Sequence, residues 1–269
     1  MICIFCKKSS VGSKSVEHIV PESLGNLSQV LPIGIVCDKC NNYFARKVEK
    51  PFMELEAIRL LRFNQSIPSK KGKVPPVKGL LNSVHDITIN RHLNKPYVAT
   101  VKIESSVFDK ILEMKQGTIM FKKDSPLPSG KTVSRFLAKV ALEAFAQRIV
   151  SSTDSIKRLA NEEEFDPIRD HARVGKVDEW SVHVRRIYDT NKNWVDEKNN
   201  NVQIIHEYDI LYTDLGELYF ILSLFGLEFA INYGGASVGG YIRWLDMHNQ
   251  VSPLYYKENK HVTKLRSDD

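Results

Sequence analysis

The fold of the N-terminal region is decided by residues 3–50, which read CIFCKKSSVGSKSVEHIVPESLGNLSQVLPIGIVCDKCNNYFARKVEK. All four cysteines of the 269-residue chain lie here, in two Cys-x-x-Cys pairs: Cys3 with Cys6, and Cys37 with Cys40. The pairs are separated by residues 7–36, which is more than the roughly 15–20 residues of a plain zinc ribbon. The insert is therefore long enough to carry a function of its own.

The two cysteine pairs predict a structural zinc site. Each Cys-x-x-Cys turn directs two sulfurs to one position, and two turns complete a tetrahedral set of four thiolates. Zinc is the default metal for such a set, and four protein ligands leave no coordination position open for catalysis. Two disulfides and a thioredoxin-like redox pair are the alternatives. Met1 leads directly into the first turn without a signal peptide, so we expect a reducing cytoplasm, which disfavours disulfides.

Between the pairs, a Glu17-His18 dipeptide is flanked by the apolar residues Val16 and Ile19. Pro21 ends any regular strand there. Residues 32–36 (PIGIV) predict a second short strand that enters the second cysteine turn. Neighbouring residues of a strand point to opposite faces, so Glu17 and His18 can reach one site only through an irregular strand or a bulge.

The order of these motifs resembles a known family. Glu-His-Ile-Val-Pro-x-Ser-Leu-Gly at residues 17–25, followed by Val-Cys-x-x-Cys-Asn at residues 36–41, is similar to the HNH endonucleases with the ββα-metal fold. The branch in which two Cys-x-x-Cys pairs hold the motif together is the most similar. The resemblance covers about residues 1–55, and its strength lies in the coincidence of three motifs that are individually weak.

The resemblance implies a role for each polar residue of the motif. His18 would be the general base that activates water, a task that suits an imidazole with an ordinary pKa near 6.5. Glu17 and Asn41 would hold a catalytic magnesium or manganese ion, since both offer the hard oxygen ligands such ions accept. Asn42 is an alternative to Asn41, which could also simply cap a helix. The family's middle Asn is missing where this chain has a proline, and either Asn26 or a backbone carbonyl would take its part.

Charge points to nucleic acid as the partner. Residues 1–80 carry 13 Lys and Arg against 6 Asp and Glu, a balance of +7, whereas the rest of the chain has a balance of −1. Such an excess is expected where a phosphate backbone binds, although a solvated basic face would look the same. The candidate DNA-binding side chains are Arg46, Lys47, Lys70, Lys71 and Lys73. No apolar run approaches the roughly 20 residues of a membrane span, so we expect no membrane partner.

The expected fold class is α+β, in three segments: a zinc-stabilised HNH domain at residues 1–63, a basic Pro/Gly linker at 64–79, and a larger α+β domain at 80–269. In the last segment the apolar periodicity predicts a core helix at 134–150. Strands are expected at 179–188, 202–212, 217–224, 226–233 and 240–245, forming an antiparallel sheet. The sequence leaves three alternative roles for this domain: specificity, dimerisation (as a homodimer or with a partner protein) or regulation.

Two functions of different class fit the sequence. The first is a metal-dependent HNH endonuclease that hydrolyses DNA phosphodiester bonds, and the resemblance implies a bacterial or phage setting in defence or restriction. The second is a zinc-stabilised nucleic-acid-binding protein whose HNH unit is inactive. The set of Glu17, His18 and Asn41 favours the enzyme, because a binding protein has no need of all three.

Overall fold

The computed structural model describes residues 1–93, 95–114, 116–176, 179–196, 198–255 and 266–267. The chain forms two compact units. The larger unit contains residues 1–21, 26–52 and 129–269, and the smaller one contains residues 22–25 and 53–128. Both helices and antiparallel sheets are present, which confirms the α+β class.

The units do not follow the predicted division at residues 63 and 80. Residues 129–269 join the N-terminal segment in one unit, and the expected linker belongs to the smaller unit. Val74 and Val77 lie inside that linker but are buried in the core of the smaller unit. A segment rich in proline and lysine was expected to be an exposed connection, yet its two valines have enough apolar surface to pack against a sheet.

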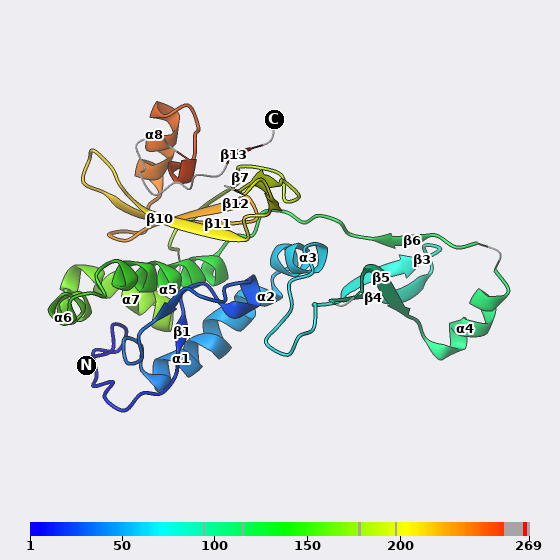
Figure 1. Ribbon diagram of the computed structural model, residues 1–269, viewed down its shortest axis with the longest axis horizontal. Helices are drawn as coiled ribbons and strands as arrows, with labels where there is room; N and C mark the ends of the chain where they lie inside the picture. The colour runs from blue at the N-terminus through cyan, green and yellow to red at the C-terminus, as the bar shows by residue number, and fades with distance from the viewer. Residues whose placement is uncertain (94, 115, 177–178, 197, 256–265, 268–269) are drawn as a thin grey trace. The chain divides into compact units, whose positions relative to one another are not determined.

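In the larger unit, the N-terminal elements are short and irregular. Their bounds are β1 (Glu17–His18), β2 (Val30–Leu31), α1 (Asp38–Phe44), a π-helical segment (Ala45–Glu49) and α2 (Lys50–Glu54). The strand expected at residues 32–36 is instead β2, displaced toward the N-terminus, because Pro32 cannot donate a ladder hydrogen bond. Figure 1 shows β1 beside α1 and α2, all in blue. These elements form a ββα unit.

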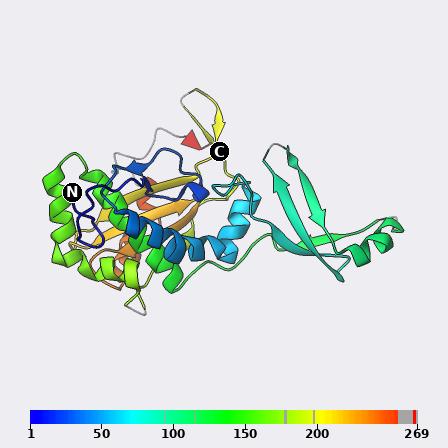
Figure 2. The ribbon, with the colours of Figure 1, turned by 90° about the horizontal axis from the view of Figure 1, so that it is seen from below.

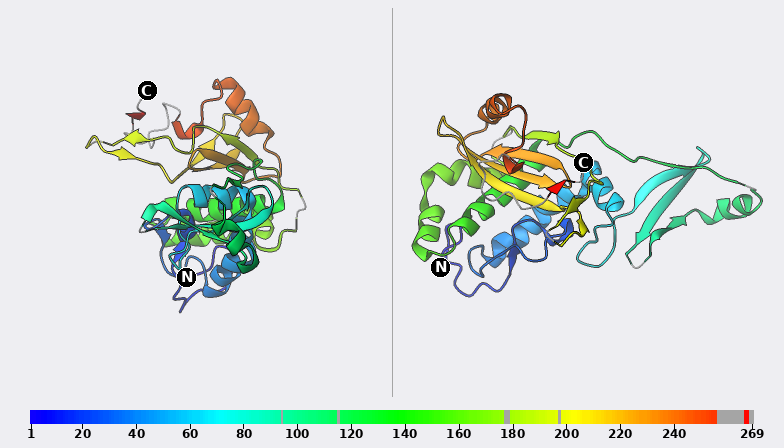
Figure 3. Two further views of the ribbon diagram at one scale, coloured as in Figure 1. Left: turned by 90° about the vertical axis from the view of Figure 1, so that its right-hand side faces the viewer. Right: turned by 45° about the horizontal axis from the view of Figure 1, so that its top comes forward.

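The remainder of the larger unit builds a sheet covered on both faces. Its elements are α5 (Lys131–Arg148), α6 (Thr153–Asn161), α7 (Asp166–Val174), β7 (His183–Arg186), β8 (Trp194–Val195), β9 (Asn201–Val202), β10 (His206–Tyr212), β11 (Leu218–Leu224), β12 (Leu227–Asn232), α8 (Gly239–Met247) and β13 (Arg266–Ser267). The main sheet is antiparallel, with the order β10-β11-β12-β7. Figures 1 and 3 show α5 on one face of this sheet and α8 on the other. All of β12 and nearly all of β11 are buried, as two covered faces require.

The helix α8 corrects the strand expected at residues 240–245. Tyr241, Trp244 and Leu245 are spaced for one face of a helix, and they pack against Tyr219 and Ile221 of β11. The core helix α5 begins three residues earlier than expected, and the remaining predicted strands correspond to β7, β10, β11 and β12. Within the described residues, no helix has the length and apolar character needed to cross a bilayer.

The smaller unit is a four-stranded antiparallel sheet with two helices. Its elements are α3 (Glu56–Asn64), β3 (Val77–Leu81), β4 (His85–His92), β5 (Lys95–Lys102), α4 (Ser105–Leu112) and β6 (Ile119–Phe121). The strand order is β5-β4-β3-β6, and Figure 2 shows β4 and β5 as a long hairpin. Leu60 and Phe63 of α3 pack with Ile87 and Ile89 of β4 to form its core.

Candidate active site and metal centre

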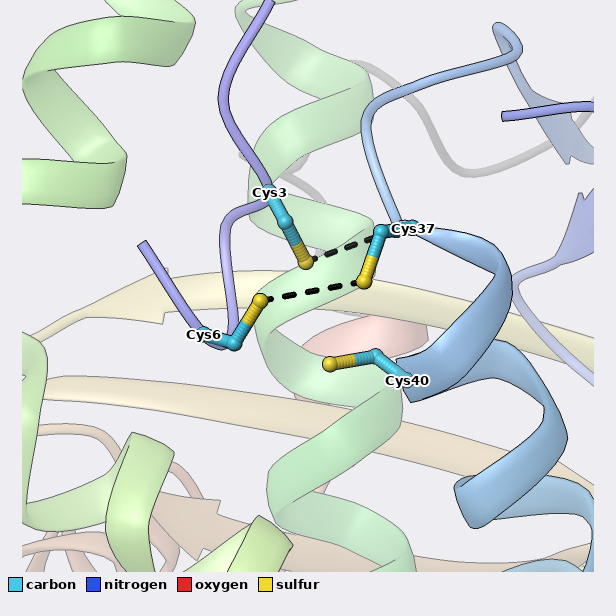
Figure 4. Close-up of side chains that lie close together, drawn as sticks. All are labelled: Cys3, Cys6, Cys37 and Cys40. Carbon is cyan, nitrogen blue, oxygen red and sulfur yellow. Dashed lines mark hydrogen bonds between the residues drawn. The ribbon is translucent and has the colours of Figure 1, made fainter. Parts of the chain in front are cut away.

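The four cysteines form one cluster. The sulfurs of Cys3, Cys6, Cys37 and Cys40 all lie within 4.8 Å of one another, and all four are free thiols. Figure 4 shows the side chains converging from two turns on one point. The Sγ atoms of Cys6 and Cys37 are 3.7 Å apart, close to the edge of about 3.8 Å expected for a tetrahedron with Zn–S bonds of about 2.3 Å. The donor set and its spacing therefore fit a closed zinc site.

Contacts from both sides hold the cysteine turns in place. The backbone N–H of Cys37 donates to Cys3 Sγ at 3.4 Å, which joins the two turns directly. Arg169 of α7 is buried, and its Nε donates to the carbonyl of Ile4 at 2.7 Å. Asp38 accepts hydrogen bonds from the backbone N–H groups of Ser15 and Lys14, which lead into β1. These bonds, first that from Ser15, lower the pKa of the Asp38 carboxyl group.

His18 lies on a regular two-residue strand. Glu17 pairs with Leu31 and His18 pairs with Val30, so β1 has no bulge. The irregular strand expected there is not found, yet both residues border one ion cluster, since Lys139 Nζ of α5 contacts the Glu17 carboxylate and the His18 carbonyl oxygen. His18 is half-buried, and its Nδ1 is a buried atom without a hydrogen-bond partner among the described residues. A buried nitrogen left without a partner costs about 1–3 kcal/mol, so this atom is available to water or to a ligand.

Glu17 points into a buried ion cluster centred on Lys139 of α5. The Nζ atom of Lys139 lies 2.6 Å from Glu17 Oε1, 2.7 Å from Glu49 Oε1 and 2.9 Å from Glu143 Oε2. It also lies 3.4 Å from the carbonyl oxygen of His18. The side chains of Lys139 and Glu143 are fully buried, and that of Glu17 is 6% exposed.

The charges of this cluster are strongly perturbed. Burial raises the pKa of both Glu17 and Glu143, because a carboxylate loses its hydration there. Burial alone acts to lower the pKa of Lys139, but the carboxylates of Glu143, Glu17 and Glu49 together outweigh it and hold that pKa well above its usual value. Lys139 is therefore a charged ammonium group that three carboxyl groups share.

The two asparagines after the second cysteine turn differ in position. Asn41 Nδ2 donates to the carbonyl of Val16 at 3.2 Å, next to β1, and its Oδ1 has no hydrogen bond with any described residue. Asn42 is exposed, and it contributes only its backbone carbonyl, which accepts from Arg46 Nε at 3.4 Å. The helix α1 thus brings Asn41, and not Asn42, against the strand that carries His18.

Asn26 holds the loop between β1 and β2. It is 1% exposed, and its Nδ2 donates to the carbonyls of Val20 at 2.7 Å and Gln29 at 2.8 Å. Its Oδ1 accepts from the backbone N–H groups of Gln29 at 2.8 Å and Ser28 at 3.1 Å. One side chain therefore satisfies four backbone groups in the loop that follows His18.

The five basic candidates fall in different units. Arg46 and Lys47 are exposed in the larger unit, whereas Lys70, Lys71 and Lys73 are exposed in the smaller one, where Lys70 pairs with Glu22 at 3.7 Å. The smaller unit carries 13 Lys and Arg against 8 Asp and Glu, a balance of +5. The larger unit carries 25 against 24, a balance of +1. The positive excess of residues 1–80 is divided between the units, with +4 in the part that holds the cysteine cluster and +3 in the part that belongs to the smaller unit.

Sequence reasoning missed Lys139 and Arg169, because both are far along the chain from the HNH-like motif. A signal for Lys139 is nonetheless present. It is a charged residue between Phe136 and Val140 on a broadly apolar helix, with Glu143 four residues later. Such a pair inside a buried helix predicts a buried ion pair. Nothing in the local sequence of Arg169 indicates that it supports the first cysteine turn.

Comparison with known proteins supports the motif directly. Residues 3–55 match the family model described as HNH endonuclease. No curated protein and no solved structure matched the chain. The matched segment contains the ββα unit, all four clustered cysteines and His18. Residues 3–55 are therefore similar to the HNH endonuclease family, in a form whose cysteine cluster fits a zinc ion.

Proposed function

We propose that the protein is a metal-dependent endonuclease that hydrolyses DNA phosphodiester bonds at β1, the strand that carries Glu17 and His18. The observation that supports this most is the buried, unpartnered Nδ1 of His18 inside a segment of HNH family sequence. A cytoplasmic location and a role in defence or restriction belong to the same proposal. The smaller unit, with its balance of +5, would add attraction for the phosphate backbone.

In this mechanism, His18 is the general base. Its imidazole accepts a proton from a water molecule as the water oxygen attacks phosphorus. The bond from phosphorus to the leaving oxygen breaks, and the leaving alkoxide takes up a proton from solvent. Asn26 keeps the loop behind His18 in one conformation, so that the imidazole is positioned before substrate arrives.

The residues also suit a magnesium or manganese ion. Asn41 Oδ1 and Glu17 Oε2 have no hydrogen bond with any described residue, and both are oxygen donors of the kind these ions prefer. Glu17 and Asn41 would hold the ion. When bound, it would supply a positive charge that stabilises the leaving alkoxide. The zinc in the cysteine cluster would have a structural part only, since four thiolates leave no open position.

The test is cleavage of supercoiled plasmid by the purified full-length protein, with and without magnesium or manganese. We expect conversion to nicked or linear DNA only with the divalent ion. His18→Ala should lower the rate by about 10²–10⁴-fold, the usual contribution of a general base.

DNA affinity and zinc content of His18→Ala should stay at wild-type levels. The matched control is His85→Ala, a histidine of β4 in the smaller unit, which should leave cleavage unchanged. If the wild-type protein binds DNA but never cleaves it, the protein belongs instead to the class of inactive zinc-stabilised binding proteins.

A further inference from the structure

We infer that Lys139 is a positioning residue of the candidate active site, acting through the carboxylate of Glu17. This inference rests on the proposed function and extends it to a residue outside the segment that matches the HNH family. Lys139 belongs to α5, more than 80 positions after that segment ends at residue 55.

Lys139 joins the two halves of the ββα unit. One of its contacts is to Glu17 on β1, the strand of His18, at 2.6 Å. Another is to Glu49 at 2.7 Å, in the π-helical segment that continues the helix of Asn41. A single ammonium group therefore bridges the strand and the helix that provide the proposed site.

The contact with Glu17 also fixes the orientation of its carboxylate. Lys139 Nζ donates to Oε1, whereas Oε2 has no hydrogen bond with any described residue. With one oxygen bonded to the ammonium, the other has a restricted direction and no hydrogen bond of its own with a described residue. Groups that hold a metal ligand in this way typically contribute 10–100-fold to metal affinity or activity.

The burial of Lys139 favours a defined role over general stabilisation. Its side chain is 0% exposed, and a buried ion pair can often be replaced by apolar residues without loss of stability. Glu143 on the same helix lies 2.9 Å from the ammonium, but neither of its carboxylate oxygens makes a hydrogen bond with a described residue. The contacts to Glu17 and Glu49 are the ones that reach across to the ββα unit.

The experiment measures manganese binding to the zinc-loaded full-length protein without DNA, by the electron paramagnetic resonance signal of free Mn²⁺. We expect Lys139→Met to weaken Mn²⁺ binding by about 10–100-fold. The matched control is Lys157→Met on α6, whose exposed lysine pairs with Asp154 and should leave binding unchanged. Equal or tighter Mn²⁺ binding by Lys139→Met would overturn the inference.

A double-mutant cycle separates positioning from general destabilisation. If Lys139 acts through Glu17, then Lys139→Met should cost no further affinity in a Glu17→Gln background. Additive losses would show that Lys139 acts independently of Glu17 and would overturn the inference. If Lys139→Met alone does not fold, Lys139→Met with Glu143→Leu replaces the buried pair by apolar groups, and the same weakening is expected.

The result also separates this inference from the proposed function. Wild-type protein that binds no Mn²⁺ would remove the proposed cation site itself, on which the inference depends. Suppose instead that wild-type protein binds Mn²⁺ and cleaves plasmid, and that Lys139→Met does both equally well. That result would support the proposed function and reject only the role of Lys139.

Discussion

The ring of Phe52 stacks on the ring of Phe136, with centroids 3.8 Å apart and planes at 7°. Phe52 ends the N-terminal part of the larger unit, and Phe136 lies on α5. Both rings are fully buried, and Phe52 also meets Phe229 of β12 edge to face at 6.1 Å. The HNH segment and the C-terminal sheet therefore share one hydrophobic core and do not form separate domains.

This shared core predicts that the two parts unfold together. Phe136→Ala should lower the free energy of unfolding by about 3–5 kcal/mol, because removal of the large buried ring leaves a cavity between α5 and Phe52. The measurement is denaturant unfolding followed by circular dichroism and by zinc release in the same sample. We expect the two signals to change at the same denaturant concentration.

The control for the shared core is Phe108→Ala, whose ring is 51% exposed on α4 of the smaller unit. That variant should stay within about 0.5 kcal/mol of wild type. Zinc release that precedes loss of the C-terminal sheet would show that the core is not shared.

The cysteine cluster predicts one zinc ion per chain. Cys40→Ser should lose the ion and destabilise the whole larger unit, because zinc binding supplies folding free energy to elements that share its core. Elemental analysis and circular dichroism check this. A protein that contains no zinc, or one that keeps its stability in strong chelator, would contradict it.

The four hydrogen bonds of Asn26 predict that its side chain stabilises the loop after His18. Asn26→Ala removes a partner from the buried carbonyl of Val20, at a cost of about 1–3 kcal/mol, and from part-buried backbone groups of Ser28 and Gln29. We expect lower stability in denaturant and, with the loop released, slower plasmid cleavage. Asn161→Ala, at the exposed end of α6, is the control and should match wild type. Normal cleavage by Asn26→Ala would show that the loop holds its conformation without this side chain.

His206 predicts a specific pH dependence of stability. Burial lowers the pKa of His206 below its ordinary value near 6.5, so the folded protein favours the neutral imidazole. A depressed pKa in the folded state gives stability that is present above about pH 6.5 and lost as the pH falls through the folded-state pKa. His206→Gln should therefore lose less stability than wild type between about pH 7.5 and pH 5.

The measurement is the melting temperature of both proteins across that pH range. Burial raises the pKa of the neighbouring Glu207, which contributes with the opposite sign, but it does so in both proteins and cancels in the comparison. A one-unit difference in the pKa of His206 corresponds to about 1.4 kcal/mol. Identical pH dependence in the two proteins would mean that His206 titrates alike in the folded and unfolded states.

The local sequence was sufficient for features that depend on spacing along the chain. The two Cys-x-x-Cys turns predicted a four-sulfur cluster, because the reach of each turn is fixed by the covalent backbone. Apolar periodicity likewise predicted α5, since a buried helix repeats its contacts every three to four residues. The Glu-His motif identified the HNH segment for the same reason: its residues are neighbours in sequence.

Only the tertiary structure decided what lies around that segment. Glu17 reads as a hydrophilic strand residue, and its partner Lys139 is 122 positions away. No periodicity encodes which helix covers a strand, so the ion cluster could not be predicted from the motif. For the same reason Gly239–Met247 reads as a strand from its composition but folds as α8, where Tyr241 and Trp244 can cover the outer face of the sheet. The sequence by itself determined the cysteine cluster and the catalytic candidates. Long-range packing decided that C-terminal residues such as Lys139 and Arg169 lie against that segment.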